Sequence, residues 1–404
     1  MIIDNLVTKI RRNCLTLQPN FTFIKNTNKM NKILSFLIVT AVLFLAACGS
    51  GESNGHGEHA TVDDTTGASW TNYIHYEQEG HFANIRQLTY GGDNAEAYWS
   101  FDDSKLVFQV KNDAWDIECD QIFYTEVATS KMDSIRPKML STGLGRTTCS
   151  YFLPGDTTIV YASTHLGDEA CPPNPEKRED GKYVWPIYPS FDIFVADLEG
   201  NIVDQLTDEE GYDAEATVSP LGDKIVFTST RTGDLELFIM DIDGSNIVQI
   251  TDELGYDGGA FFSPDGSKLI FRSSRPKTEE EIKEYKDLLA VGLVTPTEME
   301  LYICNADGSD LRQLTDLGNA NWCPFFHPDG TKVLFSSNHA SEKGYPFNLY
   351  MINIDGTGLE QVTYDGIFDG FPVFSNDGKK LVFSSNRNNN GTHDTNLFLA
   401  DWVD

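Results

Sequence analysis

Residue pairs of complementary chemistry recur at a fixed spacing in this chain of 404 residues. Eighteen positions separate the two members, and the six pairs are Asn94 with Asn112, Thr147 with His165, Asp213 with Arg231, Asp257 with Arg275, Asn321 with His339, and Asp369 with Arg387. Every pair that begins with Asp ends with Arg, whereas the others end with His or Asn. Because a planar guanidinium binds a carboxylate through two hydrogen bonds, we expect three structural ion pairs.

A second column of reactive side chains stands two positions after the first residue of each pair. In four of the six copies it holds Glu96, Cys149, Glu215 and Cys323. Arg146 and Trp322 lie close to it in the sequence, and His165 and His339 lack a carboxylate in their own pairs. Titratable and polar groups that converge on a concave surface are the usual candidates for a ligand site. We therefore predict one ligand-binding site made of these eight residues.

Histidine and cysteine could instead hold a metal ion. A site built from His165, His339 and His393 requires the three rings to converge, because metal–nitrogen bonds are only about 2.0–2.1 Å long. In the fold inferred below, His165 and His339 lie on opposite sides of a ring, so we expect each to cap its own hairpin, with no metal and no cofactor. Five cysteines follow residue 48, which permits at most two disulfides, and the spacing leaves their pairing open.

The elements that position both columns are six copies of one sequence pattern. The copies are residues 99–112, 152–165, 218–231, 262–275, 326–339 and 374–387. Between them recur Leu-, Ile- or Val-Thr pairs at Leu88-Thr89, Leu206-Thr207, Ile250-Thr251, Leu314-Thr315 and Val362-Thr363. A repeat of roughly 40 to 50 residues made of short strands is typical of a propeller blade. The Asp-Gly pairs within the copies favour tight hairpins.

Counting strands predicts an all-β, six-bladed propeller. The chain ends after the third strand of its last blade, and residues 85–88 form a strand with no blade before it. We predict that this N-terminal strand completes the last blade and closes the ring, which removes exposed sheet edges. The long insertions 165–190 and 276–297 then emerge on the same face, where binding is expected. Thr278 and Glu281 form a capping-box pattern, which predicts a short surface helix there.

The segment before the propeller is divided by composition. Residues 1–29 are interpreted as a mis-assigned translation start, and 30–47 as a signal peptide with an apolar stretch too short to span a membrane. Its ending, Leu45-Ala-Ala-Cys48, resembles a bacterial lipobox and implies lipidation of Cys48. Residues 48–69 are expected to be the lipid anchor and a flexible linker, and 70–404 the propeller.

The charge of the chain limits its partners. From Cys48 onward there are 24 Lys and Arg against 60 Asp and Glu, a formal charge of −36. Such a surface opposes non-specific binding to nucleic acid or to anionic lipid headgroups. We expect a monomer that is held at the membrane by its lipid anchor alone.

The repeat Ser263-Pro-Asp-Gly-Ser-Lys-Leu-Ile-Phe271 resembles the WD40-like Pro-Asp repeat of TolB-type propellers. The resemblance covers about residues 85–402, with drift at Ser100-Phe-Asp-Asp103, Leu153-Pro-Gly-Asp156 and His327-Pro-Asp-Gly330. It implies a protein of the bacterial cell envelope, in the periplasm or at the outer membrane. TolB binds a peptidoglycan-associated lipoprotein at its propeller mouth. TolB also has an additional N-terminal α/β domain, for which there is no room between the linker and residue 85.

Two functions follow from this resemblance. The first is a lipid-anchored, non-catalytic propeller that binds an envelope protein or an envelope polysaccharide at its loop-bearing channel mouth. The alternative is a metal-dependent polysaccharide lyase, because similar repeats build the propeller of oligogalacturonate lyases, in which histidines hold a metal. The lyase requires a metal and a base near His165 and His339.

Overall fold

The computed structural model describes residues 61–63, 69–71, 75–127, 137–342, 344–389 and 391–404. The chain divides into the units Met1–Gly57 and Glu58–Asp404, and every described residue belongs to the second. The predicted translation start, the signal peptide and the lipidated Cys48 therefore lie outside the described residues. Within the described residues, no helix is long and apolar enough to cross a membrane.

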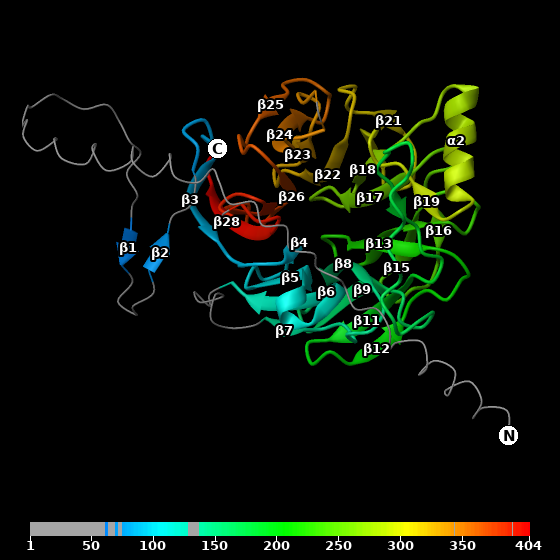
Figure 1. Ribbon diagram of the computed structural model, residues 1–404, viewed down its shortest axis with the longest axis horizontal. Coiled ribbons are helices and arrows are strands. Elements are labelled where there is room, and N and C mark those ends of the chain that lie inside the picture. Colours follow the sequence, from blue (N-terminus) through cyan, green and yellow to red (C-terminus); the bar gives the residue numbers. More distant parts are fainter. Residues whose placement is uncertain (1–60, 64–68, 72–74, 128–136, 343, 390) are drawn as a thin grey trace, which may run out of the picture. The chain divides into compact units, whose positions relative to one another are not determined.

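Six four-stranded antiparallel sheets are arranged around a common axis (Figure 1). Blade one contains β4 (Asp93–Trp99), β5 (Lys105–Asn112), β6 (Ile117–Glu126) and β7 (Lys138–Met139). Blade two contains β8 (Thr147–Phe152), β9 (Thr158–Ser163), β11 (Asp192–Asp197) and β12 (Ile202–Gln205). Blade three contains β13 (Asp213–Val218), β14 (Lys224–Ser229), β15 (Glu236–Asp241) and β16 (Val248–Gln249). The predicted six-bladed propeller is confirmed.

The remaining blades follow the same order. Blade four contains β17 (Asp257–Phe262), β18 (Lys268–Ser273), β20 (Glu300–Asn305) and β21 (Arg312–Gln313). Blade five contains β22 (Asn321–Phe326), β23 (Lys332–Ser337), β24 (Asn348–Asn353) and β25 (Glu360–Gln361). Blade six contains β26 (Asp369–Phe374), β27 (Lys380–Ser385), β28 (Asn396–Trp402) and, from the N-terminal side of the propeller, β3 (Phe82–Gln87).

The ring closes as predicted, because β3 pairs antiparallel with β28. The same junction shows why the Leu-Thr pairs recur. Thr89 Oγ1 accepts a hydrogen bond from the backbone nitrogen of Leu397 at 2.8 Å, across the closure. Thr207, Thr251, Thr315 and Thr363 accept equivalent bonds within their own blades at 2.8–2.9 Å. Each threonine therefore fixes its fourth strand to the third.

The core lies between blades and is built from the apolar end of each repeat. One aromatic residue of the second strand in every blade is fully buried: Phe108, Tyr161, Phe227, Phe271, Phe335 and Phe383. Burial of an aromatic side chain of this size contributes about 1.5–3 kcal/mol to the stability of the fold. The six equivalent aromatic residues therefore stabilise the packing of the blades. The repeat thus specifies packing between blades as well as the strands within them.

Two of the three drifted copies of the motif form contacts between blades on the face of tight turns. Asp103 and Asp156 occupy the position of the motif glycine and adopt its left-handed backbone, with φ of 57° and 56°. Asp156 accepts backbone N–H bonds from Phe101 at 2.7 Å and from Asp102 at 3.0 Å. Asp103 accepts equivalent bonds from Asn376 and Asp377. The drift therefore creates links between blades six, one and two, beside the closure.

The insertions form the remaining elements. β10 (Trp185–Pro186) from the blade-two insertion pairs with β19 (Leu293–Val294) from the blade-four insertion. The helix α2 (Glu279–Leu289) begins with the predicted capping box, in which Thr278 and Glu281 bond reciprocally. Its Tyr285 donates a hydrogen bond to Asp234 of blade three, so the helix packs on the neighbouring blade.

Two short elements complete the described chain. A 3₁₀ helix, η1 (Asp113–Trp115), follows β5 in blade one. β1 (Thr61–Asp63) pairs antiparallel with β2 (Ser69–Thr71), and β1 lies in the segment predicted to be the flexible linker.

Candidate functional site

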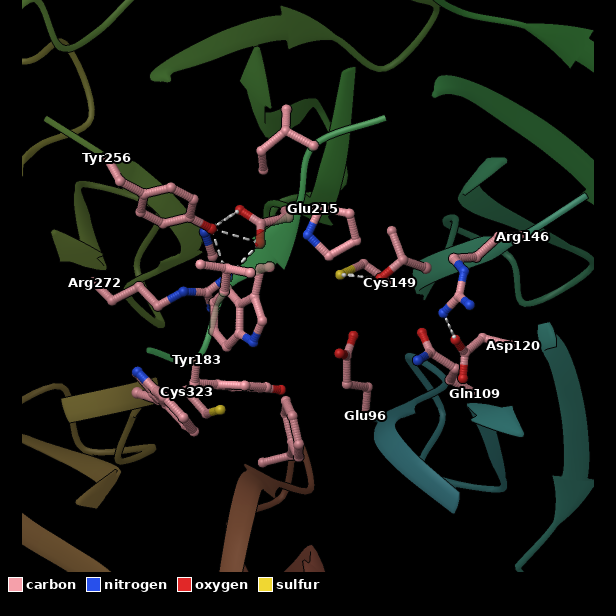
Figure 2. Close-up of a pocket in the computed structure, with 18 of the residues that line it drawn as sticks. Glu96, Gln109, Asp120, Arg146, Cys149, Tyr183, Glu215, Tyr256, Arg272 and Cys323 are labelled. Carbon is pink, nitrogen blue, oxygen red and sulfur yellow. Dashed lines mark hydrogen bonds and ion pairs between the residues drawn. The ribbon is translucent and has the colours of Figure 1, made fainter. Parts of the chain in front are cut away.

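A cavity of about 930 Å³ opens at the loop-bearing end of the channel (Figure 2). Its lining includes one residue at the same position of each inner strand: Glu96, Cys149, Glu215, Gly259, Cys323 and Phe371. Because all six blades contribute, the cavity lies on the propeller axis. The sequence column of Glu96, Cys149, Glu215 and Cys323 therefore converges, as predicted.

A β-bulge in every inner strand brings this column into the channel. The pairing of each first strand with its second strand shifts at this position in all six blades. All six residues have left-handed backbone, with φ between 44° and 60°. Non-glycine residues rarely adopt such angles, and strained backbone often accompanies functional sites. The bulge is thus a six-fold device that re-aims one side chain per blade.

Glycine at position 259 makes room for an arginine from the next strand. A Cβ atom at Gly259 would lie 2.2 Å from Nη1 of Arg272, a distance that no side chain can adopt. In the other five blades the bulged residue of the inner strand places its own side chain in the cavity. In blade four that residue is Gly259, and the guanidinium of Arg272 from β18 takes its place. The alignment of the six copies did not reveal this substitution, because Arg272 lies outside the column.

Glu215 is saturated with donors around this guanidinium. It forms an ion pair with Arg272 and accepts bonds from Tyr256 Oη at 2.7 and 2.8 Å, from Thr228 at 2.7 Å and from the Gly259 nitrogen at 2.9 Å (Figure 2). Burial acts to lower the pKa of Arg272, but the charge of Glu215 and the Tyr256 contact outweigh it and hold the pKa above its usual range. Glu215 and Arg272 balance each other's charge, and their hydrogen bonds fix this side of the cavity.

Glu96 on blade one has a different environment. Its side chain points into the open part of the cavity (Figure 2), and its buried Oε2 atom has no hydrogen-bond partner. Burial raises the pKa of Glu96 to about 7, against the opposing effects of the Cys149 thiol beside it and of Arg272. Burial and the neighbouring carboxylates Glu96 and Glu215 raise the pKa of Cys149 well above its usual range. Cys149 is therefore a neutral thiol and a poor nucleophile.

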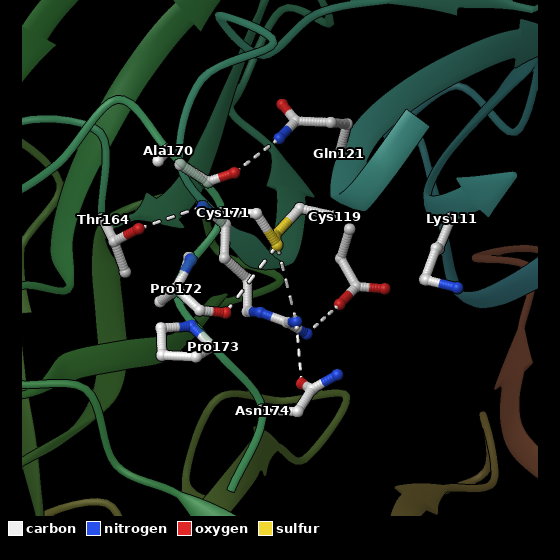
Figure 3. Close-up of a disulfide and its surroundings, with 12 residues drawn as sticks. Lys111, Cys119, Gln121, Thr164, Ala170, Cys171, Pro172, Pro173 and Asn174 are labelled. Carbon is white, nitrogen blue, oxygen red and sulfur yellow. Dashed lines mark hydrogen bonds and ion pairs between the residues drawn. A yellow bond between two sulfur atoms is a disulfide. The ribbon is translucent and has the colours of Figure 1, made fainter. Parts of the chain in front are cut away.

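The predicted Arg146 also lines the cavity, and its charge is paired. Nη1 donates to Asp120 at 2.5 Å (Figure 2), and Nη2 donates to Asn174 at 3.0 Å. A disulfide between Cys119 and Cys171, with Cα atoms 5.7 Å apart, lies beside this contact and ties the blade-two insertion to β6 of blade one (Figure 3). Cys149, Cys304 and Cys323 are free thiols. The pairing that the spacing left open is thereby resolved.

Aromatic rings form the wall nearest the insertions. Trp322 stacks on Phe347, with centroids 4.5 Å apart, and contacts Trp185 of β10 at 5.2 Å. Trp185 also lies over the guanidinium of Arg272 at 5.2 Å. The insertion of blade two, which provides Tyr183 and Trp185, thus reaches the far side of the channel. The blade-two insertion, rather than the helix α2, therefore covers part of the mouth.

His165 and His339 do not line this cavity, so the structure does not bring them together with the other six predicted site residues. Nδ1 of each ring lies 2.9 Å from a serine hydroxyl two residues earlier, Ser163 or Ser337. The rings pack on Phe194 and Tyr350 of their own blades, with centroids 4.5 Å apart in both cases. Each histidine caps its own hairpin, as we expected for the alternative to a metal site. Burial lowers the pKa of both rings.

The three predicted ion pairs are present. Arg231 binds Asp213 at 2.9 Å, Arg275 binds Asp257 through two bonds of 2.7 and 2.9 Å, and Arg387 binds Asp369 at 2.9 Å. These arginines pack on aromatic rings of their blades, as the two histidines do. The second residue of the repeated pair is thus structural in every blade in which it is Arg or His.

The closing blade adds a partner that the repeat could not reveal. Arg387 also binds Glu79 at 3.0 Å, and both side chains are fully buried. Glu79 lies outside every repeat copy, so no comparison between copies could have identified it. The contact joins the segment before β3 to the last blade and reinforces ring closure.

The lyase alternative requires a metal and a base near His165 and His339. Among the residues that the structure describes, no group of three or more His, Cys, Asp or Glu side chains is arranged to hold a metal ion. Nδ1 of each of these two histidines lies within hydrogen-bond distance of a serine in its own hairpin. The arrangement therefore offers no support for that alternative.

The comparisons with known proteins agree with this architecture. Residues 192–280 and 286–397 match the family described as "TolB beta propeller domain". This propeller is a TolB-type β-propeller. No curated protein sequence matches the chain at a significant level.

The chain is similar to several solved structures at low identity. TolB from Acinetobacter baumannii has 18% identity and a TM-score of 0.50 over 75% of this chain and 64% of that one. A putative TolB from Agrobacterium tumefaciens has 18% identity and a TM-score of 0.49 over 78% and 91%. An oligogalacturonate lyase in complex with manganese has 16% identity and a TM-score of 0.44 over 82% and 96%. At such identities the likeness concerns the fold alone.

Several residues that line this cavity were not predicted from the sequence. The main ones are Tyr98, Gln109, Asp120, Tyr183, Trp185, Tyr256, Arg272 and Phe371. Phe371 stands in the same column as Glu96 and could have been found by reading all six copies. Gly259, the one glycine of that column, was a signal that another side chain fills its place. Tyr183 and Trp185 belong to an insertion without a repeat, so no register could be assigned to them from the copies.

Proposed function

We propose that this chain is a non-catalytic binding protein of the bacterial cell envelope that receives its ligand in the axial cavity. The observation that carries the proposal is the cavity itself, about 930 Å³ in volume, at the loop-bearing mouth. Pockets of this size with aromatic walls and a few placed polar groups are typical of ligand sites.

The chemistry of the lining favours binding over catalysis. The Arg272 and Arg146 guanidinium groups are paired with carboxylates, and the Cys149 and Cys323 thiols have pKa values raised by burial, that of Cys323 to about 12. A thiol acts as a nucleophile in its thiolate form, and burial disfavours the thiolate of both Cys149 and Cys323. The ligand is an envelope protein or an envelope polysaccharide that enters between the insertions.

The location in the envelope rests on the sequence before the propeller and on the TolB-type fold. Cleavage before Cys48 and lipidation of its thiol would anchor the chain, with the following residues as a tether. Metabolic labelling with a palmitate analogue tests this directly. Label should appear in the wild-type chain and be absent from Cys48→Ser, whereas label on both variants contradicts anchoring through this residue.

Retention of an envelope component by the full chain tests the ligand site. Cys149→Phe should abolish retention, because a phenyl ring at this position projects into the cavity. Phe371 shows that a large aromatic residue is compatible with this backbone, since it has φ of 52° at the equivalent position. Leu221→Ser, on the face of tight turns, is the matched control, because Leu221 is 66% exposed and does not line the cavity.

The comparison of variants decides the proposal. A component retained by the wild type and by Leu221→Ser but lost from Cys149→Phe supports binding in the cavity. Equal retention by all three variants would contradict it. Thermal denaturation of Cys149→Phe must show that the propeller still folds.

A further inference from the structure

Two buried acceptors on the blade-one wall of the cavity have no donor. One is Oε2 of Glu96, and the other is the side-chain oxygen of Gln109 on β5. Both residues line the cavity, and Figure 2 shows them on the same side, below Cys149 and apart from the Glu215 group. A buried polar atom without a partner is unfavourable in the free protein, so a ligand that supplies a hydrogen-bond donor here gains affinity.

The charge balance of the lining specifies which donor this is. Arg272 is balanced by Glu215, and Arg146 by Asp120. Among the described lining residues, Glu96 is the buried carboxyl without an ion-pair partner. An ionised carboxylate in an apolar setting is stabilised most by a cation that also donates hydrogen bonds. The cavity wall therefore contains one buried carboxyl without an ion-pair partner, beside two arginines whose charges are balanced.

The walls around Glu96 suit a cation with an apolar stem. Phe371 is its neighbour in the column on blade six, and Tyr98 lies on the same strand, with Phe261 5.9 Å from the Tyr98 ring. Aromatic faces attract ammonium and guanidinium groups, and lysine and arginine carry such groups on flexible methylene stems. A sugar ring with many hydroxyls would find few polar partners among these rings.

We propose that the blade-one wall of the cavity binds the cationic tip of a lysine or arginine side chain of a partner protein, with Glu96 as its counter-ion. This inference rests on the proposed function and names the ligand class of the same cavity. The chain's formal charge of −36 from Cys48 onward steers such a partner towards it.

Titration calorimetry with short capped peptides tests the chemistry. The full chain is titrated with tripeptides that carry lysine, arginine or norleucine between two glycines, since norleucine keeps the stem and lacks the charge. The basic peptides should bind about tenfold or more tightly than the norleucine peptide, as expected for a charged partner in a desolvated site. Equal affinities for all three peptides would overturn the inference.

Glu96→Gln is the decisive variant, because it removes the charge and keeps the shape. It should weaken binding of the basic peptides about tenfold and leave the norleucine peptide unchanged. Glu118→Gln is the matched control at pH 8, where Glu96 is ionised, since Glu118 is an exposed carboxylate on β6 of the same blade and each replacement removes one negative charge. An equal loss in both variants would mean that only the general charge of the surface matters.

The pH dependence gives a readout that a structural role would not produce. The groups that face the Glu96 carboxyl are Cys149, Arg272, Glu215 and Asp120, and its pKa of about 7 reflects burial above all. Affinity for the lysine peptide should therefore rise as the pH increases from about 6 to about 8, where Glu96 ionises, and stay flat in Glu96→Gln.

The outcomes separate this inference from the proposed function. If an amino-sugar oligomer binds in the cavity and the basic peptides do not, the ligand is a polysaccharide. The inference that a protein side chain binds there is then wrong. If Cys149→Phe loses an envelope component but no basic peptide binds, only this inference fails. If neither experiment shows binding in the cavity, both fail.

Discussion

Glu96 and Glu215 occupy the same position of their blades and differ in everything around them. Both lie two positions after the first residue of the repeated pair, both have left-handed backbone with φ of 56° and 58°, and both line the axial cavity. Glu215 accepts bonds from a guanidinium, a phenol, a hydroxyl and a backbone nitrogen. Glu96 has one buried oxygen with no donor.

The difference lies in the neighbouring blade. Blade four has glycine in the column, which admits Arg272 and completes the shell of Glu215. The blades that flank blade one have Cys149 and Phe371 in the column, and neither provides a cation. A carboxylate that is saturated by its neighbours is part of the scaffold, whereas one that lacks partners is available to a ligand. Equivalent positions in a repeat protein therefore do not imply equivalent roles.

The largest expected effect on stability is at Glu215, the glutamate whose hydrogen-bond partners are all present. Glu215→Gln should lower the free energy of unfolding by about 3–5 kcal/mol, because it leaves the guanidinium of Arg272 buried without its carboxylate. Denaturant unfolding followed by tryptophan fluorescence measures this. Glu96→Gln is the control at the equivalent position and should cost little. Similar losses in the two variants would show that the two glutamates contribute equally to the fold.

Removal of the disulfide tests the support of the blade-one side of the cavity. Replacing both Cys119 and Cys171 with serine should lower stability by about 2–4 kcal/mol, because the bond closes a long segment, with a sequence separation of 52 between the two cysteines. The loss should fall between that of Glu215→Gln and that of the glycine variant below. An unchanged denaturation midpoint would show that the insertion is held by its other contacts.

Gly259→Ala probes the space that the Arg272 guanidinium requires. The added methyl group would collide with Nη1, and overpacking of this kind costs about 1–3 kcal/mol. Gly233→Ala separates the collision from the backbone strain, since Gly233 has φ of +92° and a Cβ added there would meet no atom within 4 Å. A larger loss in Gly259→Ala than in Gly233→Ala is expected in thermal denaturation. Equal losses would leave only the strain.

The last prediction concerns the unpaired glutamate and takes the form of a dependence on pH. The pKa of Glu96 is raised to about 7 by burial, above the value of about 4.3 in an unfolded chain. The folded protein therefore binds the proton more tightly, so the stability that this group contributes is fully present below about pH 4.3 and is lost as the pH rises through about 7. Glu96→Gln should match the wild type near pH 4 and exceed it in melting temperature near pH 8. A difference that does not change with pH would contradict the raised pKa.

The sequence predicted the ring and its self-contained pairs well. The six copies, the closing strand, the capping box of α2 and the three Asp–Arg pairs all follow from spacing that is local to one blade. The first and second strands of a blade are joined by a tight hairpin, so a residue at the start of one must face the end of the next. Such relations can be read without knowledge of the other blades.

Other features could not be derived in this way because they join segments far apart in the chain. The disulfide of Cys119 with Cys171, the Arg387 contact with Glu79 and the place of Trp185 against Trp322 all join segments that follow no repeat. His165 and His339 were assigned to the mouth because they lacked a carboxylate, but a serine two residues earlier and an aromatic ring satisfy them locally. The lack of a carboxylate in the repeated pair therefore does not show that a histidine lacks every partner.

The amino-acid sequence by itself determined the number of blades, the closure of the ring and the column of side chains that points to the axis. Periodicity and hairpin geometry are short-range properties, and they require no knowledge of the whole fold. Only the tertiary structure decided which members of that column are satisfied. Whether a carboxylate has hydrogen-bond and ion-pair partners depends on the side chains of the adjoining blades. The bulged inner strands bring Glu96 and Glu215 into one cavity, but their neighbours differ.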